Sequence, residues 1–190
     1  ARVARSSGDC LAGREASSAE LYLKRAVSVR SGHRLTTRDL VTADFTLQLQ
    51  EYQANDPASG DFVDLHAAVA CRGFHGQTRF WISRRDVDRF LSDASNLSTQ
   101  TSDASQLLGG WDDAQERLRL QVTRAGLSGQ FVARVRIANA GPREEQWNRV
   151  ETEFICPSVA LSSFLTDLTR ILDERAQGIA VLTGDPEAIA

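Results

Sequence analysis

Apolar and polar residues alternate along several stretches of this sequence, and this period of two constrains the fold more than any other feature. Phe45, Leu47 and Leu49 alternate with polar residues, and the same pattern returns around Leu120 and Val135. Such alternation is typical of strands with one buried face. The predicted strands are residues 45–49, 62–71, 74–82, 118–122, 131–137 and 150–156.

Two other segments have the period of about 3.6 residues that an amphipathic helix requires. Ser83 and Asp86 have the spacing of a helix N-terminus, where a hydroxyl and a carboxylate satisfy free amides of the first turn. The apolar stripe that follows comprises Val87, Phe90, Leu91 and Ala94. A second helix is predicted from Pro157-Ser158 to a stop at Gly178. Its apolar stripe comprises Leu161, Phe164, Leu165, Leu168, Ile171 and Leu172.

These elements predict the order β-β-β-α-β-β-β-α, with residues 95–106 as a loop and an additional short strand left open near 107–111. One apolar face per strand and one stripe per helix fit an α+β fold, in which the helices pack on one face of an antiparallel sheet. We expect this main domain over residues 44–178 and a tail over 179–190. Residues 1–43 are expected to be a basic, partly flexible N-terminal extension with one or two short elements.

The charge is unevenly distributed along the chain. The whole sequence has 22 basic and 25 acidic residues, a formal net charge of −3. Residues 1–38 hold eight basic and three acidic residues, a net charge of +5, so the remaining 14 basic and 22 acidic residues give the rest of the chain a net charge of −8. Phosphate binding needs clustered Lys and Arg, which argues against nucleic acid as a partner of the main domain. A basic protein suits an acidic domain better.

Composition also bears on the compartment in which the protein works. No apolar run reaches the about 20 residues that span a bilayer, so we expect no membrane partner. Cys10, Cys71 and Cys156 are odd in number and widely spaced, which favours a reduced, cytoplasmic protein over a disulfide framework. Cys71 and Cys156 end apolar strands and are expected to fill buried space.

The sequence contains no familiar catalytic motif. It has neither a glycine-rich phosphate loop nor a G-x-S-x-G nucleophile turn. His66, Cys71 and His75 match no standard zinc spacing, so we expect no metal and no cofactor. Glu151 and Glu153 share one face of a strand, where a solvated surface is favoured over a pair for general acid–base chemistry. The chain is therefore expected not to be an enzyme, and no catalytic residue is predicted.

Acidic residues and tryptophans in two segments are the best candidates for binding a partner. Tryptophan on a polar surface is common at the energetic centre of protein interfaces. Trp111 follows a glycine pair and Trp147 lies on the polar face of its strand, whereas Trp81 is expected in the core. The predicted partner-binding residues are Trp111, Asp112, Asp113, Glu116, Glu144, Glu145 and Trp147.

Several of these segments together resemble the WapI family of bacterial immunity proteins. The resemblance rests on Cys71–Gly76 (CRGFHG), Phe80-Trp81-Ile82 and the helix Asp86–Leu91, and it continues through Gly109–Trp111. The strands at 118–122 and 129–137, the closing strand and the helix at 161–172 extend it over about residues 44–175. Its signature is a Gly-Phe-x-Gly strand, a helix with an aromatic residue and a long last helix.

The resemblance implies a non-enzymatic protein that binds and neutralises a cognate polymorphic toxin. The residues themselves leave two alternatives open. One is a small-molecule-binding or hydrolytic domain that uses a carboxylate pair. The other is an interaction module whose basic N-terminal extension contacts nucleic acid while the main domain binds protein.

Overall fold

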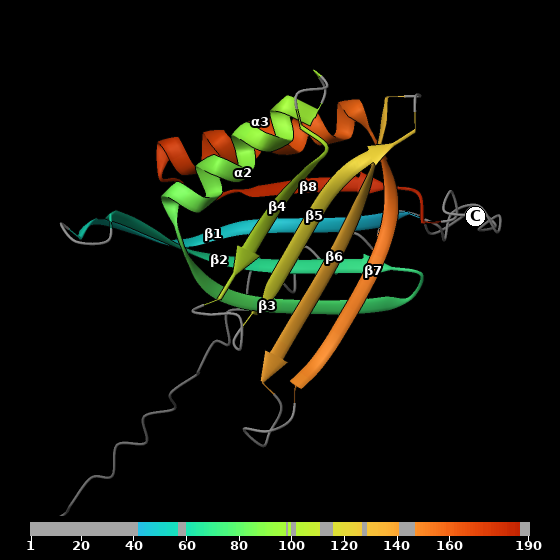
Figure 1. Cartoon of the computed structure of the whole chain (residues 1–190). Coiled ribbons are helices and arrows are strands. Elements are labelled where there is room, and N and C mark those ends of the chain that lie inside the picture. Colours follow the sequence, from blue (N-terminus) through green and yellow to red (C-terminus); the bar gives the residue numbers. More distant parts are fainter. Residues whose placement is uncertain are drawn as a thin grey trace, which may run out of the picture. The chain divides into compact units, whose positions relative to one another are not determined.

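The computed structural model describes residues 42–56, 60–97, 99, 102–110, 116–126, 129–140 and 147–186, with the side chains of 55, 56, 140 and 147 left out. Almost all of the predicted N-terminal extension therefore lies outside the described residues, together with the short elements expected in it. All statements below refer to the described part of the chain. Figure 1 shows these elements as a ribbon coloured along the sequence.

The described elements have the predicted order and confirm an α+β fold. They are β1 (Ala43–Asp56), β2 (Gly60–Cys71), β3 (Phe74–Ser83), α2 (Arg84–Leu97), β4 (Ala104–Gly109), β5 (Leu118–Ala125), β6 (Gln130–Ala140), β7 (Trp147–Pro157), α3 (Ser158–Glu174) and β8 (Ile179–Gly184). The additional short strand near 107–111 exists as β4, which starts earlier, at Ala104, inside the segment expected to be a loop.

The strands form two antiparallel sheets where one was expected. Sheet A has the order β3-β2-β1-β8, and sheet B has the order β4-β5-β6-β7. In Figure 1 the strands of sheet B run diagonally across those of sheet A. Helix α3 packs against β8, and α2 packs against β4 and contacts α3. Helix α2 follows β3 directly, and this separates the first three strands from the hairpin series β4 to β7.

Strand β8 lies in the segment predicted to be a tail. It pairs with β1, with Phe45 opposite Leu182, and its Ala180 and Leu182 are fully buried. Residues 179–184 of the predicted tail therefore belong to sheet A. At six residues, β8 is too short for its alternation to stand out from the sequence around it.

Both helices bury nearly all the side chains that their periodicity predicts; Leu91 of α2 is only partly buried, at the margin of the core. Val87, Phe90 and Ala94 of α2 are buried, as are all six apolar residues predicted for α3. Helix α3 ends earlier than predicted, because Arg175 takes the left-handed conformation (φ 50°) that terminates it. Gly178 instead permits close packing, since a Cβ there would lie 2.6 Å from Cγ1 of Ile171.

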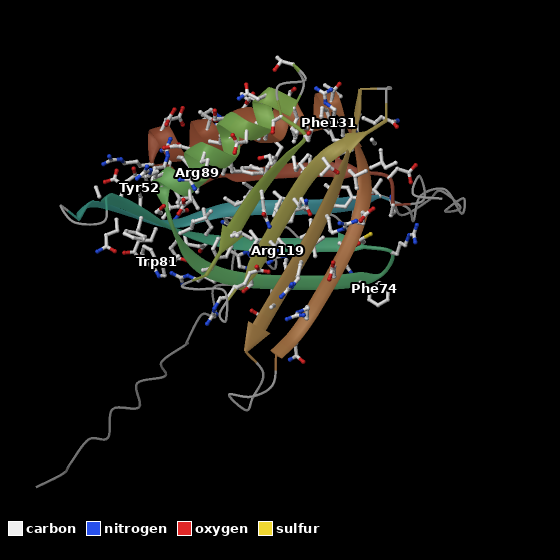
Figure 2. All side chains as sticks on the ribbon, in the orientation of Figure 1. Tyr52, Phe74, Trp81, Arg89, Arg119 and Phe131 are labelled. Atoms are coloured by element: carbon white, nitrogen blue, oxygen red, sulfur yellow. The ribbon has the colours of Figure 1, made fainter. Side chains whose placement is uncertain are left out.

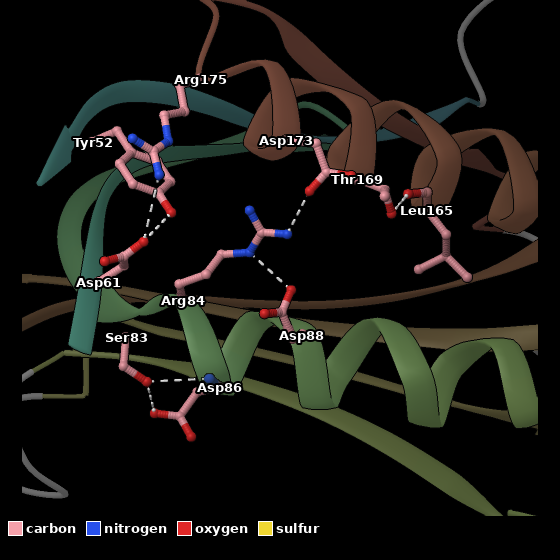
Figure 3. A network of polar contacts seen from close by, with 10 residues as sticks. All are labelled: Tyr52, Asp61, Ser83, Arg84, Asp86, Asp88, Leu165, Thr169, Asp173 and Arg175. Carbon is pink, nitrogen blue, oxygen red and sulfur yellow. Dashed lines mark hydrogen bonds and ion pairs between the residues drawn. The ribbon is translucent and has the colours of Figure 1, made fainter. Parts of the chain in front are cut away.

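A polar network connects the two helices with each other and the β1–β2 hairpin with the end of α3 (Figure 3). The Arg84 guanidinium donates to Oδ1 of Asp88 and to Oδ1 of Asp173, both at 2.8 Å, and so joins α2 to α3. The Tyr52 hydroxyl donates to Oδ2 of Asp61 at 2.6 Å. Arg175 lies over the Tyr52 ring, 4.4 Å from its centroid, which connects β1 to the residue that ends α3.

Replacing Ser83 with alanine tests the predicted helix N-terminus. The Ser83 hydroxyl accepts a hydrogen bond from the Asp86 amide at 3.1 Å and donates to the Asp86 carboxylate at 2.6 Å. Its loss should lower the free energy of unfolding by about 1 kcal/mol, measured by urea denaturation. Ser92→Ala, on the exposed side of the same helix, should change stability by less than about 0.5 kcal/mol. Equal effects of the two substitutions would contradict the assignment of Ser83 as the cap.

The environment of Tyr52 predicts a shifted titration. Its hydrogen bond to Asp61 is the main cause that raises the pKa of Tyr52 above its ordinary value of 10.0, and burial adds to it. The bond is present while the phenol is neutral, so its contribution to stability is complete below pH 10 and is lost as the pH rises through the higher, folded-state pKa. In a Tyr22→Phe background, only Tyr52 titrates in the ultraviolet absorbance of tyrosinate. Asp61→Asn should lower the pKa of Tyr52. An unchanged midpoint of the tyrosinate titration would show that the hydrogen bond to Asp61 does not cause the shift.

Candidate functional site

The topology of sheet B brings the two predicted binding segments to the same end of that sheet. Strand β4 ends at Gly109 opposite Leu118, where β5 begins, and β6 ends at Ala140 opposite Trp147, where β7 begins. Because Leu118 also lies opposite Ile137, the β4–β5 and β6–β7 connections leave sheet B at the same end of its strands. Figure 1 shows these strand ends together at the lower end of sheet B.

Most of the predicted binding residues lie in these connections, outside the described residues. This applies to Trp111, Asp112, Asp113, Glu144 and Glu145. Trp147 is described only as the backbone residue that begins β7. Their role in binding a partner stays a prediction.

Glu116 is the one predicted binding residue whose side chain is described, and it is largely buried. Its side chain is 7% exposed, and its carboxylate binds Arg119 at 3.0 Å and lies 3.5 Å from Nε of Arg136. The reason is that sheet pairing continues past Leu118: the Arg117 amide donates to Gly109 O at 2.8 Å, and the Ala138 amide donates to Arg117 O at 2.9 Å. Glu116 is thus held against β6, whereas the predicted acidic turn would have left its side chain in solvent.

The outer face of sheet B has a ladder of arginines and glutamates. Arg134 on β6 lies opposite Glu153 on β7 and donates to its Oε2 at 2.6 Å. Arg136 lies opposite Glu151 in the register, but its ion pair is with Glu116, with Nε 3.5 Å from Oε1. Such cross-strand pairs of opposite charge stabilise a solvated sheet face. Glu151 and Glu153 therefore lie among arginines on a sheet face that is partly exposed to solvent.

A cavity of about 310 Å³ lies beside β7. Its wall includes Phe74, whose ring is 69% exposed next to the tight β2–β3 turn. Figure 2 shows this ring projecting from the ribbon near β7. Arg72, which has a φ of 48° in that turn, donates to the carbonyl of Pro186 after β8. The turn, the end of β8 and the middle of β7 thus meet at one place.

A second cavity, of about 290 Å³, lies at the edge of β3 near the start of β5. Its lining includes the fully buried Asp64, which accepts from Nε of Arg79 at 2.6 Å. The other carboxylate oxygen of Asp64 has no hydrogen-bond partner. Trp81, expected in the core, is half-buried at the rim of this cavity. Burial, followed by repulsion from Arg79, lowers the pKa of the neighbouring His66.

The cysteines and histidines form no metal site among the described residues, where no group of three His, Cys, Asp or Glu side chains could hold an ion. Cys71 and Cys156 are both free and buried. Burial raises the pKa of the Cys156 thiol to about 11. A thiol that stays protonated is a poor nucleophile, so Cys156 fills space in the core.

Two features of this region were missed from the sequence. Phe74 lies six residues before the buried Phe80, so the alternation predicts that both side chains face the core. The periodicity does not indicate that the first residues of β3 extend past the core and leave Phe74 exposed. In the alternation of β2, Asp64 lies on the side opposite the core, where solvent exposure is expected, yet it is fully buried. In the sequence, the burial of Asp64 could be anticipated only from its partner Arg79. Arg79 becomes its neighbour when β2 pairs with β3.

The protonation of Cys156 predicts its reactivity. At about pH 8 roughly one Cys156 thiol in a thousand is ionised in the folded protein, given its pKa of about 11. Iodoacetamide should therefore leave Cys156 unmodified in the native chain and alkylate it in guanidinium chloride, as measured by peptide mass spectrometry. Rapid alkylation of native Cys156 would show that the thiol is accessible and ionised.

Comparison with known proteins adds no relative to this picture. No protein-family model, no curated protein and no solved structure matches the chain. The resemblance to WapI-type immunity proteins stays a prediction from the sequence.

Proposed function

We propose that this chain is a non-enzymatic immunity protein that binds and neutralises a cognate bacterial toxin domain in the cytoplasm. The observation that carries the proposal is the convergence of the β4–β5 and β6–β7 connections at one end of sheet B. Each connection contains two adjacent acids and adjoins or includes a tryptophan: Asp112 and Asp113 in one, Glu144 and Glu145 in the other. Two loops on adjacent hairpins of a packed sheet are a common way to build a protein-binding surface.

The scaffold beneath these loops supports their use in binding. The inward residues Leu118, Leu120 and Val135 are fully buried, so the strands that carry the loops belong to the core. A surface held by a rigid sheet loses little conformational entropy when a partner binds. No helix of the described residues is long and apolar enough to cross a membrane.

The loop charges suit a partner with a basic surface. Glu116, the described acid nearest the β4–β5 connection, is paired with Arg119 and Arg136 within the chain. Recognition of a basic toxin would therefore depend on the four loop acids, with Trp111 and Trp147 as apolar anchors. Charge complementarity of this kind accelerates association and selects the partner.

Binding to the product of the neighbouring toxin gene tests the proposal. The two proteins should co-purify and bind at submicromolar concentrations. Replacing Asp112 and Asp113 with asparagine, or Glu144 and Glu145 with glutamine, should weaken binding at least about tenfold and reduce its dependence on salt. No association at micromolar concentration would refute the proposed function.

A matched control removes the same number of charges elsewhere. Glu51 lies on β1, and Asp103 precedes β4 at the end of sheet B opposite the loops; both are exposed. The double variant Glu51→Gln, Asp103→Asn should bind the toxin as tightly as the unmodified chain. If it weakens binding as much as the loop variants do, net charge and not the loop surface determines the affinity.

A further inference from the structure

Strand β7 is an edge strand of sheet B, and its backbone shows which residues face the open side. It pairs with β6 alone within the sheet. Beyond the sheet, the Ile155 amide donates to Asp185 O at 3.0 Å and the Asp185 amide donates to Ile155 O at 2.7 Å. Ile155 therefore directs its N–H and C=O away from β6. Since alternate residues of an antiparallel strand point these groups to the same side, Glu153, Glu151 and Arg149 do so too.

These three residues make no backbone hydrogen bonds along that edge within the described part of the chain. Asp185 is followed by Pro186, which has no N–H and so cannot continue the pairing that Asp185 begins. Arg149 and Glu151 are exposed and Glu153 is half-buried. The edge thus presents a short row of free donors and acceptors, which is a template for another strand.

The cavity beside β7 lies along the same row. Its wall includes Glu151, Thr152 and Glu153, with the exposed ring of Phe74 next to them. Its volume of about 310 Å³ is enough for one or two side chains of a segment laid along the edge. Pro186 is also part of the wall, so the groove ends where the pairing with Asp185 ends.

We infer that the edge of β7 accepts an extended segment of the protein partner, which adds a strand to sheet B. The inference rests on the proposed function, since it names how a toxin would dock next to the loops. Side chains of an added strand alternate between two faces. Those on the outer face lie beside Glu151, which has no ion pair with a described residue, and are basic, whereas those on the other face enter the groove by Phe74 and are apolar. The partner segment therefore alternates basic and apolar residues.

A second copy of the chain fits the edge less well. In an antiparallel pairing of two β7 strands centred on Glu151, the two Glu151 carboxylates would lie opposite each other, which is destabilising. A pairing centred on Val150 would place Arg149 opposite Glu151, but it would leave Glu153 opposite Trp147, with no basic residue facing it. A basic strand places an opposite charge beside Glu151 instead. Formation of a dimer through this edge would assign it to a second copy and overturn the inference.

A peptide probe tests the edge without the toxin. The full chain, labelled with ¹⁵N, is mixed with the peptide acetyl-Lys-Val-Lys-Val-Lys-Val-Lys-amide, and amide exchange is followed by NMR. Saturating peptide should slow exchange at Glu151 and at least one of its edge neighbours, Arg149 and Glu153, at least about tenfold by hydrogen bonding. The same peptide with alternate backbone nitrogens methylated should give no protection. Absence of protection with the unmethylated peptide would overturn the inference, as would equal protection by both peptides.

Two substitutions at one position separate the backbone from the charge. Glu151→Pro removes an N–H that points away from β6, so the β6–β7 ladder stays intact, and it should weaken peptide binding at least about tenfold. Glu151→Gln keeps the N–H and removes the charge, and it should weaken binding only a few-fold. Thermal unfolding of both variants checks that each is folded. Binding of the peptide to folded Glu151→Pro with unchanged affinity would overturn the inference.

The toxin complex distinguishes this inference from the proposed function. If the toxin binds Glu151→Pro as tightly as the unmodified chain while the loop variants lose binding, the immunity function stands and docking at the edge is wrong. If the toxin binds neither the unmodified chain nor any variant while the peptide still protects the β7 amides, the edge is a strand-binding site and the immunity function is wrong.

Discussion

Burial of one side of every strand against a shared apolar core is the interaction on which the remaining structure depends. Phe45 of β1 and Phe164 of α3 meet with ring centroids 6.1 Å apart, and Phe154 of β7 is fully buried in the same core. Sheet A, sheet B and both helices contribute to one cluster of buried side chains. The polar features at the surface, including the Arg84 network and the arginine–glutamate ladder, are positioned by that packing.

Close approach of backbone to side chain lets the two sheets come together at their margins. A Cβ on Gly109 would lie 2.2 Å from ring atoms of Phe80, so only glycine lets β4 pass over β3. A Cβ on Gly184 would lie 2.4 Å from Phe154 Cδ2 and 2.5 Å from Ile155 O. This contact allows the chain after β8 to leave sheet A and reach β7. Two small residues thus determine where the sheets meet.

Local patterns in the sequence predict the elements well, because the forces that form them act between near neighbours. The cap at Ser83 and the six buried residues of α3 depend on spacing within one helix. The division into two sheets and the pairing of β8 with β1 depend on residues far apart in the chain, such as Phe45 and Leu182, and periodicity contains no information about them. The candidate site also depends on residues far apart in the chain. The two connections meet at one end of sheet B because of strand pairing, and Glu116 is buried because of its distant partner Arg136.

The position of β8 has a consequence for the order in which the chain acquires structure during synthesis. Strand β1 lies inside sheet A, between β2 and β8, so one of its sides stays without a partner until residues 179–184 have been made. Pairings between such distant segments slow folding, because a long loop must close before they form. A newly made chain therefore exposes the unpaired backbone N–H and C=O groups along one edge of β1 throughout translation of sheet B and α3. Unpaired strand edges of this kind favour association with other chains, so completion of β8 removes a route to aggregation.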